Sequence, residues 1–241
     1  PKTGAILAMA NSPQYNPQNF SYYDSSLYTN PAVANLYEPG SIMKPLIMAA
    51  AINENKVTPE TKCDKCAGPR HIGGYDIHTF NDQYHPNLIM TDVLINSDNT
   101  GMVFVGEQLG FDKLYAYLKA YGFGQKTGVD LQEEESGNLK NYNDFYDIDK
   151  ATVTFGQGIN INALQMMKAW TSLANNGQMS TPHIVSQIVT GGKTITLNWP
   201  QSSQIFSPAT AKTVTEILTR VARESPEHFP IDAVKELAGF K

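Results

Sequence analysis

The stretch Tyr37-Glu-Pro-Gly-Ser-Ile-Met-Lys-Pro-Leu-Ile-Met-Ala-Ala-Ala-Ile52 predicts a helix with an almost wholly apolar body. The helix begins at Pro39-Gly40, and Pro45 falls in its first turn, where proline is tolerated. We expect such a helix to be buried on every side. Ser41 and Lys44 lie three residues apart, so both side chains project from one face near the positively polarised N-terminus.

A serine hydroxyl is a weak nucleophile until a base removes its proton, and a desolvated lysine can be neutral enough to do so. Ser41 and Lys44 therefore predict a nucleophile and its general base. A Ser-x-x-Lys pattern is expected about once by chance in a chain of this length. Here it occurs once, and it lies on a helix whose predicted burial would desolvate the lysine.

The middle of the chain is predicted to be helical, and Ser97-Asp98-Asn99 stands at a junction between two of its helices. Such a junction can present a hydroxyl and an amide to a cleft. It can equally be an ordinary helix cap, because Ser, Asp and Asn are the favoured capping residues. A similar triplet, Ser136-Gly137-Asn138, lies within an acidic loop and is interpreted as a turn. The helices predicted here are Asn87–Ile95, Asn99–Leu109 and Phe111–Tyr121.

Strands are expected towards both ends of the chain, which predicts an α/β lobe closed by the two termini with a helical lobe inserted between them. The α/β lobe comprises roughly residues 1–56 and 178–241, and the helical lobe roughly 57–177. The remaining predicted elements are a strand at Ala5–Ala10, loops up to Leu36 and from Val57 to Pro86, a helix at Asn162–Asn176, a hairpin of Ile184–Val189 and Thr194–Leu197, and a helix from Ser207-Pro208 through Val221.

The composition and charge of the chain argue for one globular core and against nucleic acid as a partner. The 241 residues are 41% hydrophobic and 17% charged, enough for one sizeable core. A net charge of -5 argues against nucleic acid, and no apolar run reaches the 18 or more residues of a membrane span. Because the chain opens with Pro1-Lys-Thr-Gly rather than Met, we expect the natural protein to extend upstream.

Two cysteines, Cys63 and Cys66, form a C-x-x-C pair, with His71, His78 and His85 downstream. Together they raise the question of a zinc site. The histidines recur across Gly-Gly and near a proline, which rules out a shared helix face, and no second C-x-x-C exists. We therefore expect no metal, and a local disulfide and two free thiols both remain open.

Ser-x-x-Lys and Ser-Asp-Asn are two of the three sequence boxes of penicillin-binding proteins and class A β-lactamases. Further segments, at residues 4–13, 37–45, 122–131 and 155–159 with Gln165, resemble the transpeptidase domain of a class B penicillin-binding protein. The resemblance implies a penicillin-binding transpeptidase (serine β-lactamase-like) α/β fold, with an antiparallel sheet lobe and an all-helical lobe. It also implies that Ser41 is the acylated nucleophile, Lys44 the general base, Ser97 a proton relay and Asn99 a binder of the substrate's peptide amide.

The third box, Lys-Thr-Gly on a strand, has no convincing match. Lys2-Thr3-Gly4 precedes the first predicted strand, Lys126-Thr127-Gly128 matches a structural segment of the family, and Lys193-Thr194-Ile195 lacks the glycine. In the family this box follows a segment that resembles Ala238–Lys241. We therefore expect the chain to be truncated just before it, and the segment alone to be inactive and poorly folded.

By resemblance, the function is that of a serine-type peptidoglycan D,D-transpeptidase, which cross-links stem peptides through an acyl-enzyme and is inhibited by β-lactams. No cofactor is implied. The expected partners are stem peptides, β-lactams, a membrane glycan polymerase and other wall-synthesis proteins. The expected location is the exocytoplasmic face of the bacterial cytoplasmic membrane, with an anchor outside this chain.

Three alternatives stay open, namely a serine β-lactamase, a penicillin-sensing receptor domain and a non-catalytic wall-synthesis scaffold. The β-lactamase is disfavoured, because the Glu-x-x-Leu-Asn pattern of class A enzymes is absent: Glu135 is followed by Ser-Gly-Asn-Leu.

Overall fold

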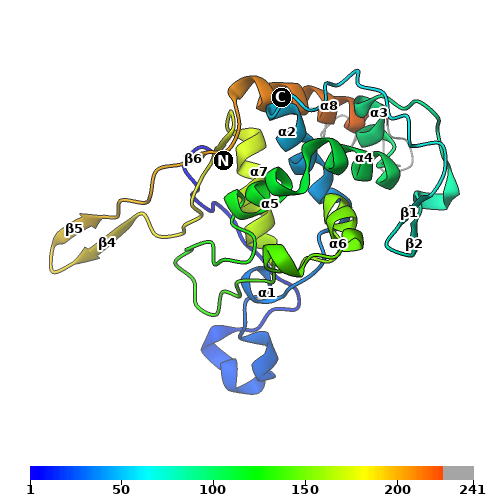
Figure 1. The fold of residues 1–241 in the computed structure, drawn as a ribbon. Coiled ribbons are helices and arrows are strands. Elements are labelled where there is room, and N and C mark those ends of the chain that lie inside the picture. The colour runs from blue at the N-terminus through cyan, green and yellow to red at the C-terminus, as the bar shows by residue number, and fades with distance from the viewer. Residues whose placement is uncertain (225–241) are drawn as a thin grey trace.

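The computed structural model describes residues 1–224, and helices dominate them (Figure 1). The α-helices are α1 (Pro31–Ala34), α2 (Lys44–Asn53), α3 (Met90–Ile95), α4 (Asn99–Leu109), α5 (Phe111–Ala120), α6 (Asp147–Thr152), α7 (Ala163–Ala174) and α8 (Pro208–Glu224). Short 3-10 helices occupy Pro17–Tyr22, Ser25–Leu27, Gly40–Met43, Phe80–Asp82, Tyr142–Asp144 and Val153–Phe155. None of the helices in these residues combines the length and the apolar character that a membrane span requires.

The strands of the described residues pair two by two in antiparallel fashion. The pairs are β1 (Arg70–Ile72) with β2 (Tyr75–Ile77), β3 (Gln178–Met179) with β6 (Ser203–Gln204), and β4 (Gln187–Thr190) with β5 (Lys193–Thr196). The β4–β5 hairpin extends away from the helices, and all eight of its strand residues are exposed (Figure 1).

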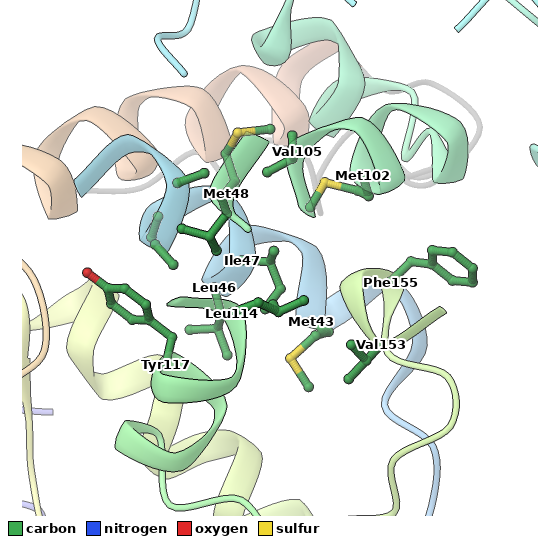
Figure 2. Close-up of a cluster of buried hydrophobic side chains, with 14 of the residues drawn as sticks. Met43, Leu46, Ile47, Met48, Met102, Val105, Leu114, Tyr117, Val153 and Phe155 are labelled. Carbon is green, nitrogen blue, oxygen red and sulfur yellow. The ribbon is translucent and has the colours of Figure 1, made fainter. Parts of the chain in front are cut away.

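Helix α2 is the centre of the core, as its sequence predicts. Every residue from Lys44 to Ala51 is buried, and α4, α5, α7 and α8 pack around it. Figure 2 shows side chains of this core. The hydroxyl of the fully buried Tyr121 donates to the Leu46 carbonyl oxygen at 2.8 Å, which satisfies a polar group inside the core. Ser41 and Lys44 thus lie at the N-terminal end of this buried helix.

Most predicted elements are confirmed, some with shifted bounds. Helix α4 has the predicted bounds, and the predicted hairpin around Gly191-Gly192 is present as β4–β5. Helix α3 begins at Met90 rather than Asn87, because Asn87 has a φ of 61°, which a right-handed helix does not allow. The predicted division into lobes at residues 57 and 178 stays a prediction.

Three expectations about the loops and strands are wrong. Ala5–Ala10 is not a strand: only Ala5 pairs, in an isolated bridge with His183, and Leu7 is 95% exposed. Within the described residues no bridge continues this pairing towards Ala10, so no ladder forms. The loop expected up to Leu36 contains α1, and the loop expected from Val57 to Pro86 contains the β1–β2 hairpin. Residues 147–152, for which the sequence makes no prediction, form α6. Ala238–Lys241, the segment expected before the third box, lies outside the described residues.

Candidate active site

The turn that carries Ser41 is held by a second segment, residues 155–161. Tyr37 and Ile161 exchange backbone hydrogen bonds of 2.9 and 3.0 Å, and the Gly40 N–H donates to the Gly156 carbonyl oxygen at 3.0 Å. Gly156 has a φ of 79°, and a Cβ at this position would lie 2.2 Å from the Gly40 oxygen. Only glycine allows this approach. The segment Phe155–Ile159, which resembles the family, thus supports the backbone of the turn that carries Ser41.

Lys44 is 2% exposed, and its ammonium contacts the Ser97-Asp98-Asn99 turn. Nζ donates to the Ser97 carbonyl oxygen at 2.5 Å, to Ser97 Oγ at 3.0 Å and to Asn99 Oδ1 at 2.8 Å. Burial lowers the pKa of Lys44 to about 8, against the opposing charge of Asp98. The structure therefore brings Lys44, Ser97 and Asn99 together, with Ser41 three residues before the lysine.

The Ser97-Asp98-Asn99 turn also caps α4. Asp98 Oδ1 accepts from the Gly101 N–H and from the Thr100 hydroxyl, both at 2.8 Å. Ser97 has a φ of 51°, the left-handed conformation, at the point where the chain turns between α3 and α4. The two interpretations left open by the sequence are thus compatible: Asp98 is the helix cap, and its two neighbours contact Lys44.

Beside Lys44 lies a cavity of about 360 Å³, formed where α2, α3, α7 and α8 meet. The exposed Ser41 lines it, and its remaining lining is chiefly apolar: Ile42, Pro45, Leu94, Ile95, Trp170, Leu218, Val221 and Ala222, with Lys44 and Ser97 as the other polar members. Trp170 Nε1 donates to the Ile42 carbonyl oxygen at 3.1 Å, directly beside the serine. Trp170, Leu218 and Val221 were not predicted as site residues. Their only sequence signal is an apolar position on an amphipathic helix.

Lys126-Thr127-Gly128 is part of a structural loop. The buried Glu134 carboxylate accepts from the backbone N–H groups of Thr127 at 2.6 Å and Gly128 at 3.3 Å, and Lys168 Nζ donates to the Thr127 carbonyl at 3.1 Å. None of the three residues lines the cavity beside Ser41.

Cys63 and Cys66 form a disulfide with a Cα–Cα distance of 5.6 Å, and both are fully buried. Of the two states that the sequence left open, the structure contains this one. Two of the nearby histidines pair with acidic side chains: His71 Nδ1 lies 2.8 Å from Asp76, and His78 Nδ1 lies 2.7 Å from Asp82. Across residues 1–224 no three His, Cys, Asp or Glu side chains cluster in a way that could hold a metal ion.

The sequence profile described as the penicillin binding protein transpeptidase domain matches residues 1–233. This chain belongs to that family. Stage V sporulation protein D of Bacillus subtilis is 34% identical over 228 residues, which cover 93% of this chain and 35% of that protein. The peptidoglycan D,D-transpeptidase FtsI of Buchnera aphidicola is 32% identical over 226 residues, covering 92% and 38%. The chain thus spans little more than a third of these relatives.

The fold is also that of solved family members. Penicillin binding protein 3 of Mycobacterium tuberculosis, crystallised with aztreonam, superposes with a TM-score of 0.86 at 28% identity, covering 95% of this chain and 51% of that one. The expected penicillin-binding transpeptidase fold is therefore confirmed, although the described strands form only two-stranded pairs.

Proposed function

We propose that the protein to which this chain belongs is a serine-type peptidoglycan D,D-transpeptidase. The observation that carries the proposal is Lys44, a buried lysine with a lowered pKa, placed three residues after an exposed serine that lines the same cavity. The family membership and the similarity to the Buchnera D,D-transpeptidase FtsI support the same activity.

In the proposed reaction, Ser41 Oγ attacks a peptide carbonyl of the stem peptide while neutral Lys44 Nζ takes its proton. The tetrahedral intermediate collapses when the C–N bond to the terminal residue breaks, and the leaving amine receives a proton relayed from Lys44 through Ser97. The amine of a second stem peptide then attacks the Ser41 ester and gives a proton to neutral Lys44. The ester C–O bond breaks, Lys44 returns the proton to Ser41 Oγ, and the new amide is the cross-link. The Ser41 N–H would supply one oxyanion donor, and Asn99 would bind the substrate's amide.

The state of Lys44 decides whether this chemistry is available at neutral pH. A pKa of about 8 leaves about a tenth of the lysines neutral at pH 7, whereas a lysine at its ordinary 10.5 would be neutral in about one molecule in three thousand. The apolar walls of the cavity help to keep the pKa of Lys44 low, because they limit the hydration of its ammonium group.

The proposal extends to partners and location. β-lactams would acylate Ser41 as substrate mimics, and a membrane glycan polymerase with other wall-synthesis proteins would work beside the enzyme. The site would act at the exocytoplasmic face of the cytoplasmic membrane, held there by an anchor outside this chain. The comparisons give no support to the β-lactamase, sensor or scaffold alternatives.

Labelling with a fluorescent penicillin tests the function in the protein expressed with the flanking sequence of its gene. Mass spectrometry is expected to find the label on the peptide containing Ser41, and Ser41→Ala should abolish it. Ser136→Ala, in the other Ser-x-Asn triplet, is the matched control and should label normally. Cross-linking of stem-peptide substrates separates a transpeptidase from a sensor, which acylates without forming cross-links. Label that persists in Ser41→Ala would refute the assignment.

A further inference from the structure

Three polar side chains gather near Asn99 on the loop between β2 and α3. His78 Nδ1 lies 2.7 Å from Asp82 Oδ1 and 3.0 Å from the Tyr84 hydroxyl, which itself donates to the same carboxylate oxygen at 2.9 Å. Because a carboxylate can only accept, Nδ1 is the nitrogen that carries the proton. The reaction proposed above uses none of these three residues.

The backbone of His78 contacts the site directly. Asn99 Nδ2 donates to the His78 carbonyl oxygen at 2.9 Å, while Asn99 Oδ1 accepts from Lys44 Nζ at 2.8 Å. An ammonium only donates and a carbonyl only accepts, so these two neighbours allow one orientation of the Asn99 amide and exclude the flipped one. Among residues 1–224 the His78 carbonyl is the one acceptor of Nδ2, and its second N–H is directed to no other group there, so it can serve a substrate carbonyl.

The three side chains, called here the His78 cluster, close the loop that presents this carbonyl. Inside the loop, the Thr79 hydroxyl donates to the Gln83 carbonyl at 2.9 Å, and Asp82 takes a φ of 52°. The His78–Asp82 contact joins the two sides of the same turn. The side chains of His78 and Asp82 are 51% and 69% exposed, so water competes for both partners and the restraint is modest.

We propose that the His78 cluster is a positioning device, which holds the His78 carbonyl at the Asn99 amide and so keeps Asn99 oriented for Lys44 and for substrate. The inference rests on the proposed function and adds a positioning residue to it. The competing explanation is that the cluster only stabilises a surface turn. The chain contains a matched pair for comparison, because His71 and Asp76 form the same contact on the β1–β2 hairpin.

The experiment measures the acylation rate of the protein by a fluorescent penicillin as a function of pH, together with its melting temperature. His78→Ala should lower the rate about three- to fivefold, the scale of one exposed polar side-chain pair. The midpoint of the pH–rate curve should also move to lower pH, because a misoriented Asn99 no longer offers Oδ1 to the Lys44 ammonium. Asp98, the charged group that faces Lys44, is unchanged in these variants.

His78→Asn places an amide nitrogen near the position of Nδ1 and should restore both the rate and the midpoint. His71→Ala should change neither. An unchanged rate and midpoint in His78→Ala would overturn the proposal, as would a lower melting temperature with an unmoved midpoint and no rescue by asparagine.

A readout without activity separates this inference from the proposed function. The side-chain amide resonances of Asn99, identified by their loss in Asn99→Asp, should shift in His78→Ala and return in His78→Asn. If the wild-type protein takes no penicillin label, the proposed function fails and the resonances still decide on positioning. Resonances that stay unchanged in His78→Ala would refute it.

Discussion

Replacing Lys44 by methionine should make the protein more stable at neutral pH, by an amount that falls as the pH rises. The pKa of Lys44 is about 8 in the folded state and 10.5 when the chain is unfolded. The unfolded state therefore binds more protons between these values, and the stability of the wild type rises with pH through that window. Methionine is unbranched and apolar, and carries no proton to desolvate.

The lowered pKa sets the magnitude. At pH 7, where Lys44 is mostly protonated in both states, the lowered pKa costs the folded state about 3 kcal/mol. At pH 10 the folded lysine is neutral while the unfolded one is still mostly protonated, and the cost has fallen to about 1 kcal/mol. The hydrogen bonds that Lys44 makes to Ser97 and Asn99 are lost in the variant and offset part of the gain at each pH. The change between the two pH values, about 2 kcal/mol, is therefore the quantity to measure.

Urea unfolding of wild type and Lys44→Met at pH 7 and pH 10 provides the assay. The advantage of the variant should shrink by about 2 kcal/mol between the two conditions. Lys119→Met, at an exposed position on α5, is the matched control and should differ from wild type equally at both pH values. An advantage of Lys44→Met that is the same at pH 7 and pH 10 would refute the lowered pKa, and with it the reason for a neutral base.

Further outcomes are expected for Lys44, for two glycines and for the two cysteines. Lys44→Ala should slow acylation by about two to four orders of magnitude, and the wild-type rate should rise with pH up to about 8, in a kinetic pH profile. Gly156→Ala should destabilise the fold by about 2 kcal/mol or more in thermal melts, because its Cβ would meet the Gly40 carbonyl. Gly158→Ala, with a φ of 75° and no contact closer than 3.4 Å, should cost about half as much. For Cys63 and Cys66, mass spectrometry should find two hydrogens fewer than the dithiol, and elemental analysis no zinc.

The sequence predicts elements well where local signals agree. Helix α4 has a capping Asp98 before it and Gly110 after it, and both bounds are predicted correctly. Helix α6 has no apolar periodicity that would predict it. Its residues 147–152 are helical because the Asp149 carboxylate accepts from the Tyr146 N–H at the start of the helix and because Ala151 is buried in the core. The strand expected at Ala5–Ala10 fails because a strand requires a partner, which no local pattern encodes.

The site residues also divide into those with a local sequence signal and those that depend on distant parts of the chain. Ser41 and Lys44 are predicted from spacing and burial alone, since a helix fixes their geometry. The contacts of Lys44 with Ser97 and Asn99 join residues 53 and 55 positions apart, so only the resemblance to a family anticipated them. The apolar cavity wall could not be predicted, because it forms only when α7 and α8 pack beside α2.

Trp170 has a consequence for spectroscopy. Its indole N–H donates to the backbone beside Ser41, and its ring lines the cavity that an acyl group would enter. The chain contains only two tryptophans, and the other, Trp199, stacks on His183 at a ring distance of 4.8 Å and is not part of the cavity wall. With Trp199 replaced by phenylalanine, Trp170 would be the only tryptophan of the chain, and selective tryptophan excitation would report on the cavity without the twelve tyrosines. The molecule therefore carries its own optical probe of site occupancy, which can follow unlabelled ligands in real time.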